Sequence, residues 1–136
     1  MLAQNFNTPK QLGITKTMHA ALVKVLGMLE RGEIVHSPDV EDLFRFPKGQ
    51  LNFNMNVWEK PRGQNCGTVH CIGGWAEHVS DARFRFGPLP RALGNLFYPP
   101  SISGLDYERI NTYQAASALR NYLTLGEARW DEVLGE

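Results

Sequence analysis

The chain has 136 residues, of which 43% are apolar, and its 14 basic residues balance 14 acidic ones. This length and composition exclude a disordered chain and predict one domain with a single core. The equal numbers of basic and acidic residues argue against nucleic-acid binding. The lack of ~18 consecutive apolar residues argues against a membrane span. We therefore expect a cytoplasmic protein that binds neither nucleic acid nor a membrane.

The N-terminal stretch differs from the rest of the chain. Residues 1–14 are polar and mixed, and Thr8-Pro9 is interpreted as opposing a helix. We therefore expect residues 1–14 to form a mobile or loosely docked arm, and residues 15–136 to form a single helical domain.

Two helices are predicted in the first third of the chain. Apolar residues recur at the spacing of one helix face over residues 17–31, and Gly32 follows in the position of a helix end. Further on, Ser37-Pro38 combines a capping residue with a proline suited to the first helical position. This pattern predicts a short second helix that ends at about Phe44.

Residues 51–57 alternate apolar and polar side chains, which is typical of a half-buried extended segment. One option is pairing with residues 83–86, which alternate likewise. The asparagines of this segment are interpreted as a solvated face or as turn-making amides. A carbohydrate-binding surface is the alternative, because amides both donate and accept hydrogen bonds.

Three more helices are predicted in the last third. One follows Pro90 and ends before Tyr98, and the next begins with a capping box at Asn111 and closes near Gly126. A short last helix carries Trp130. The sequence thus predicts a mainly α fold, a compact single domain of about five helices with at most a small extended or two-stranded element.

The stretch from Gln64 to Ser80 concentrates both cysteines and two of the four histidines. Its apolar spacing predicts a buried helix that begins at about Thr68 and packs at the centre, against the helices of residues 17–31 and 112–125. Inside it, Gly73-Gly74 costs roughly 1 kcal/mol per glycine relative to alanine, so we expect another helix to approach closely there.

A cysteine at the start of that helix could be a reactive thiol. Free backbone amides would lower the pKa of the Cys66 thiol, which makes Cys66 a candidate nucleophile. Gln64 is then a candidate oxyanion donor, and His36 or His19 a candidate base. The favoured interpretation is structural, with Cys66 as a helix-entry residue and Cys71 as a small buried apolar residue, so enzymatic activity stays open.

The cysteines and histidines of this stretch are also residue types that bind zinc. Four bonds to zinc from one helix are geometrically implausible for the cysteines and histidines present. The remaining alternative is that Cys66 and His70 together supply half of the ligands of a zinc site. We therefore predict no metal and no cofactor.

Two segments together carry a resemblance. Residues 53–58, Phe-Asn-Met-Asn-Val-Trp, precede Cys-Gly-Thr-Val-His-Cys-Ile-Gly-Gly-Trp-Ala at residues 66–76. This pair resembles a motif of small uncharacterised proteins from bacteria and their phages, for which no activity is established. The resemblance implies a compact, mainly helical cytoplasmic domain and assigns no catalytic residues.

Functionally, the sequence favours a non-enzymatic accessory or protein-interaction domain with an unknown protein partner. Its expected contact surface includes exposed aromatic side chains, namely Trp58, Tyr98 and Trp130. The alternative is a cysteine-dependent hydrolase or transferase with Cys66 as its nucleophile.

Overall fold

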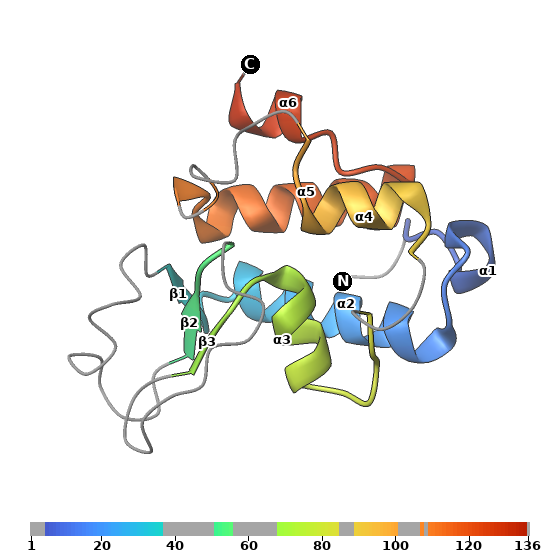
Figure 1. Cartoon of the computed structure of the whole chain (residues 1–136), viewed down its shortest axis with the longest axis horizontal. Coiled ribbons are helices and arrows are strands. Elements are labelled where there is room, and N and C mark those ends of the chain that lie inside the picture. Colours follow the sequence, from blue (N-terminus) through green and yellow to red (C-terminus); the bar gives the residue numbers. More distant parts are fainter. Residues whose placement is uncertain are drawn as a thin grey trace.

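The computed structural model describes residues 5–36, 51–55, 68–84, 89–100, 107 and 109–135. These residues confirm the predicted mainly α fold with a small strand element (Figure 1). The helices are α1 (Pro9–Leu12), α2 (Lys16–Glu30), α3 (Ile72–His78), α4 (Arg91–Phe97), α5 (Thr112–Leu125) and α6 (Trp130–Leu134). The strands are β1 (Val35–His36), β2 (Leu51–Phe53) and β3 (Thr68–His70). The helix predicted to end near Phe44 lies outside the described residues.

Local signals fix both ends of the two long helices. The Thr15 hydroxyl accepts a hydrogen bond from the Met18 amide at the start of α2, and Gly32 follows its end with φ 73°. At α5, Asn111 and Gln114 form the reciprocal capping box, and Gly126 closes the helix with φ 85°. The predicted boundaries are confirmed because they depend only on neighbouring residues.

The core lies between α2 and α5, which pack against each other through their apolar faces. Figure 1 shows α4, α5 and α6 above α2 and α3. Beside this core, Arg120 on α5 forms a two-pronged ion pair with Glu30 on α2, at 2.7 and 2.8 Å. Among the described residues, no helix is both long and apolar enough to cross a membrane.

The strands form a parallel sheet in the order β1-β2-β3. Both edges of β2 are therefore occupied, and residues 83–84 belong to no strand, so the predicted pairing of residues 51–57 with residues 83–86 does not occur among the described residues of the two segments. A central parallel strand is covered on both faces. Accordingly, Asn52 and Asn54 are 0% exposed, so the interpretation of these amides as a solvated face or a carbohydrate-binding surface is also wrong.

Helix α3 is buried, as predicted, but it begins at Ile72 rather than at Thr68. Residues 68–70 instead continue the sheet as β3. The Trp75 indole donates a hydrogen bond of 2.9 Å to the Asn52 carbonyl oxygen, which ties α3 to β2. On its other side α3 packs against α2, and Figure 1 shows the two helices crossing.

Residues 5–14 contact α2 and α5. Thr8-Pro9 begins α1 instead of opposing a helix, because threonine caps it and proline fits the first position. The Asn7 amide donates to the Leu123 carbonyl oxygen at 2.7 Å, and His19 Nε2 donates to the Asn7 carbonyl oxygen at 2.8 Å. These bonds connect the segment to the ends of both long helices.

Candidate functional site

The residues predicted for cysteine catalysis are only partly described. Cys66, Gln64 and the aromatic Trp58 lie outside the described residues. The position at the start of the central helix, which was predicted for Cys66, belongs to Cys71, because α3 begins at Ile72. The thiol at the start of α3 is therefore that of Cys71.

The Cys71 side chain is 3% exposed, and its sulfur accepts a hydrogen bond from the Gly74 amide at 3.4 Å. Burial raises the pKa of the Cys71 thiol to about 11, against the weaker lowering effect of the helix amides. The thiol is thus protonated at neutral pH. The prediction that Cys71 is a small buried apolar residue is confirmed.

The two candidate bases lie on different elements. His19 is on the first turn of α2, where Nε2 is engaged by the Asn7 carbonyl oxygen. His36 is on β1, and its ring lies 6.3 Å from that of Phe53. Within the described ranges, no group of three or more histidine, cysteine or acidic side chains could hold a metal ion.

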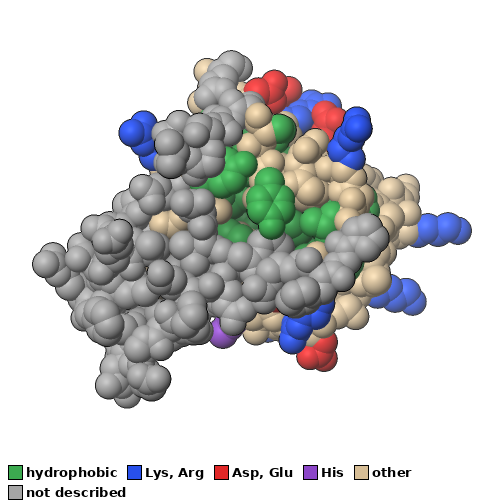
Figure 2. All heavy atoms as spheres, in the orientation of Figure 1, with side chains coloured by type: hydrophobic (Ala, Val, Ile, Leu, Met, Phe, Trp, Pro, Cys, Tyr) green, Lys and Arg blue, Asp and Glu red, His purple; other side chains and the backbone are tan. Residues whose placement is uncertain are grey.

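The described aromatic candidates have opposite environments. Tyr98, directly after α4, is 52% exposed, as predicted. Trp130 is only 3% exposed, so its prediction as an exposed aromatic is wrong. Figure 2 shows hydrophobic side chains in the middle of the face that carries α4 and α5, with charged side chains around its margin.

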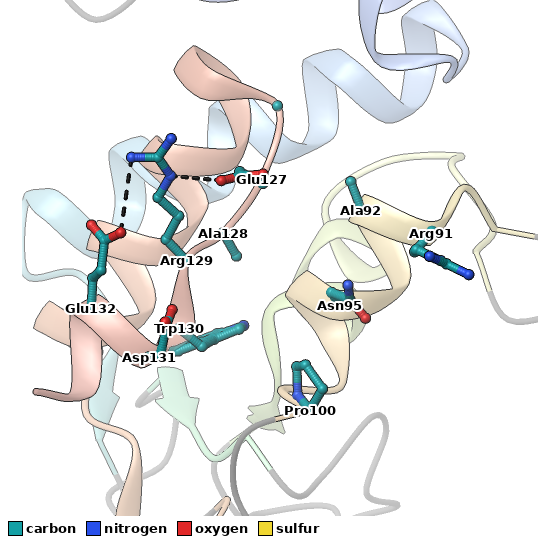
Figure 3. Close-up of a pocket in the computed structure, with 11 residues that line it drawn as sticks. Arg91, Ala92, Asn95, Pro100, Glu127, Ala128, Arg129, Trp130, Asp131 and Glu132 are labelled. Atoms are coloured by element: carbon teal, nitrogen blue, oxygen red, sulfur yellow. Dashed lines mark hydrogen bonds and ion pairs between the residues drawn. The ribbon is translucent and has the colours of Figure 1, made fainter. Parts of the chain in front are cut away.

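Beside Trp130 lies a cavity of about 590 Å³, which we call the α4–α6 groove (Figure 3). Its lining consists of Arg91, Ala92 and Asn95 on α4, of Pro100, and of residues 126–132. The α4 side chains lie on one side of the groove in Figure 3, opposite Trp130 and its neighbours. Two segments about thirty residues apart in the chain therefore build one surface.

Hydrogen bonds fix the apolar base of the groove. The Trp130 indole donates to the Leu96 carbonyl oxygen at 3.1 Å, and the Asn121 amide donates to the Ala128 carbonyl oxygen at 3.0 Å. Both Ala128 and Trp130 are buried, whereas Arg129 between them is exposed. The base of the groove is thus part of the folded core and needs no rearrangement to form.

Arg129 has the only left-handed conformation among the described residues other than glycine, with φ 57° and ψ 51°. A side chain in this region costs about 1 kcal/mol or more. The turn buries both neighbours and directs the guanidinium outward, toward Glu127 at 2.7 Å and Glu132 at 3.9 Å. The hydrogen bond to Glu127 raises the pKa of Arg129, so this wall carries a permanent cation between two acids.

Sequence reasoning missed Asn95, Arg129 and Asp131 as groove residues. A weak signal existed, because charged residues alternate with the apolar Ala128 and Trp130 at the end of the chain. That alternation does not reveal which other element lies opposite.

No family model matches the chain, and no match was found among the curated proteins or the solved structures.

Proposed function

We propose that this chain is a cytoplasmic, non-enzymatic accessory domain that binds another protein through the α4–α6 groove and the adjoining Tyr98. The observation that carries the proposal is the groove itself, which combines an apolar base with a charged and polar rim. Protein interfaces commonly have this composition, with aromatic and arginine side chains enriched at their centres.

The rigidity of the groove supports this function. Its base is held by the hydrogen bonds of Trp130 and Ala128, so little ordering would be required on binding. Association loses free energy whenever loops and side chains must be ordered, and a preformed surface reduces that loss. Tyr98 adds an exposed aromatic ring at the end of α4.

The enzymatic alternative has less support. It needs a thiolate of lowered pKa, whereas the thiol at the start of α3 belongs to Cys71 and has a raised pKa. His19, one of its candidate bases, is engaged by a backbone carbonyl through Nε2. No observation on the described residues favours a second function over protein binding.

Site-specific photo-cross-linking in the cells that naturally produce the protein tests the proposal. Benzoylphenylalanine is placed at Asn95 or Tyr98, and at Tyr113 as a control, because Tyr113 is 84% exposed but does not line the groove. A discrete cross-linked protein is expected from Asn95, which lines the groove, and from Tyr98, but not from Tyr113. Absence of a product at both, or the same product at all three, would contradict the proposal.

A further inference from the structure

The segment of residues 5–14, which we call the N-terminal arm, contacts the chain where α5 leads into the groove. The Asn7 amide donates a hydrogen bond of 2.7 Å to the Leu123 carbonyl oxygen, in the last turn of α5. Carbonyl groups of a last turn have no partner within their helix, so the arm satisfies this one from outside. The Asn7 side chain also lies next to Gly126, the first residue after α5 and part of the groove lining.

The other end of the arm contacts the opposite side of the groove. Gly13 lies next to the ring of Pro90, which directly precedes α4 and makes no side-chain capping bond to it. The next residue, Arg91, belongs to the groove lining. Figure 1 shows α1 beside the end at which α4 begins. The arm therefore connects the two segments from which the groove is built.

The arm is attached to the body by contacts that lie outside the main core. His19 Nε2 on α2 donates to the Asn7 carbonyl oxygen at 2.8 Å. The half-buried Phe6 ring packs against the core, with the Arg120 guanidinium 5.7 Å from its centroid. Segments with half-buried side chains and few backbone bonds open locally at low free energy. The arm can thus detach while the core between α2 and α5 stays folded.

We infer that the N-terminal arm is a strap that regulates the α4–α6 groove. In the docked state it holds α4 and the residues after α5 at the spacing that binds the partner protein, and its release lets the two sides separate. The inference rests on the proposed function and adds a means of regulating the same site. Such coupling is reciprocal, so a partner bound in the groove also favours the docked arm.

The distance across the groove, measured by pulsed electron paramagnetic resonance on the full chain, tests this inference without a partner. Spin labels are attached through Arg91→Cys on the α4 side and Glu132→Cys on the α6 side, both at exposed positions. The chain also carries Cys66→Ala, and Cys71 is buried and stays unlabelled. With the wild-type arm, one narrow distance distribution is expected.

The double variant His19→Ala with Phe6→Ala weakens the docking of the arm. The fraction of molecules with a longer distance should rise at least about tenfold, because a hydrogen bond and an apolar contact are lost together. Thr17→Ala is the matched control, since Thr17 is an exposed residue in the same turn of α2. Circular dichroism establishes that each variant is folded, and Phe6→Ala alone, which changes no helix residue, should shift the distances in the same direction.

Cross-linking from benzoylphenylalanine at Asn95 then connects the distance to binding. The yield of the cross-linked partner should fall in the double variant and stay unchanged in Thr17→Ala. Equal distance distributions in the double variant and the wild type would overturn the inference, as would a longer distance with an undiminished yield. Either result leaves the proposed function supported, provided that the wild-type chain still yields its product from Asn95.

Discussion

The indole Nε1 of Trp130 donates a hydrogen bond to the carbonyl oxygen of Leu96, at 3.1 Å and across 34 positions of the sequence. Leu96 lies in the last turn of α4, where carbonyl groups have no partner within the helix. The bond satisfies that carbonyl and joins α6 to α4 at the base of the groove. Formation of the groove therefore depends on this pair.

Replacement of Trp130 by phenylalanine removes this donor while retaining a buried ring. The Leu96 carbonyl is then left without the indole, and we expect the free energy of unfolding to fall by about 1–3 kcal/mol. Urea unfolding followed by circular dichroism measures the change. Tyr113→Phe is the control, since Tyr113 is largely exposed. Equal stability of Trp130→Phe and the wild type would show that the bond contributes nothing.

Tyr122 has a buried hydroxyl with no hydrogen-bond partner among the described residues. An unsatisfied buried polar group costs roughly 1–3 kcal/mol. Tyr122→Phe should therefore raise the free energy of unfolding, by about 1 kcal/mol, and raise the melting temperature. A lower melting temperature would indicate that the hydroxyl is satisfied after all.

The same hydroxyl predicts a dependence of stability on pH. Burial raises the pKa of Tyr122 from 10.0 to about 12. Because the folded pKa lies above the unfolded one, Tyr122 ionises first in the unfolded state, so its ionisation does not affect stability below pH 10 and lowers it progressively as the pH rises toward 12. The stability difference between wild type and Tyr122→Phe, measured from pH 9 to pH 11.5 by urea unfolding, should shift further against the wild type above pH 10. A constant difference across this range would contradict the pKa assignment.

Cys71 should be inert in the folded protein. Its sulfur is buried and its thiol has a pKa of about 11, so native Cys66→Ala protein should react with iodoacetamide at pH 7.5 only when α3 opens. We expect modification at least about a hundredfold slower than in urea-unfolded protein, as measured by mass spectrometry. Comparable rates in the two states would show that the thiol is accessible.

Local and long-range features of the chain differ in how well the sequence predicts them. The ends of α2 and α5 were predictable because caps at Thr15 and Asn111 act on amides three residues away. The start of α3 was not, since residues 68–70 have helical spacing but pair with β2. The burial of Asn52 likewise depends on strands distant in the sequence. The same limit applied to the groove, whose two sides meet only through tertiary packing.

Arg129 provides a test of backbone strain next to the groove. At φ 57°, glycine is tolerated without the steric cost that a side chain brings. We therefore expect Arg129→Gly to be more stable than Arg129→Ala by about 1 kcal/mol, since both lose the exposed ion pairs and only alanine retains the strain. Thermal unfolding compares the two variants. Greater stability of the alanine variant would contradict the left-handed turn.

The affinity of the partner protein captured by cross-linking tests the account most directly. Calorimetric titration compares the wild type with Tyr98→Ala, at the exposed tyrosine that directly follows α4, and with Tyr113→Ala, an exposed tyrosine on α5 that does not line the groove. Loss of an aromatic anchor at an interface typically costs about 2 kcal/mol, so Tyr98→Ala should weaken binding about thirtyfold while Tyr113→Ala leaves it unchanged. Unchanged affinity in Tyr98→Ala, together with unchanged affinity in Asn95→Ala, would show that the partner binds elsewhere.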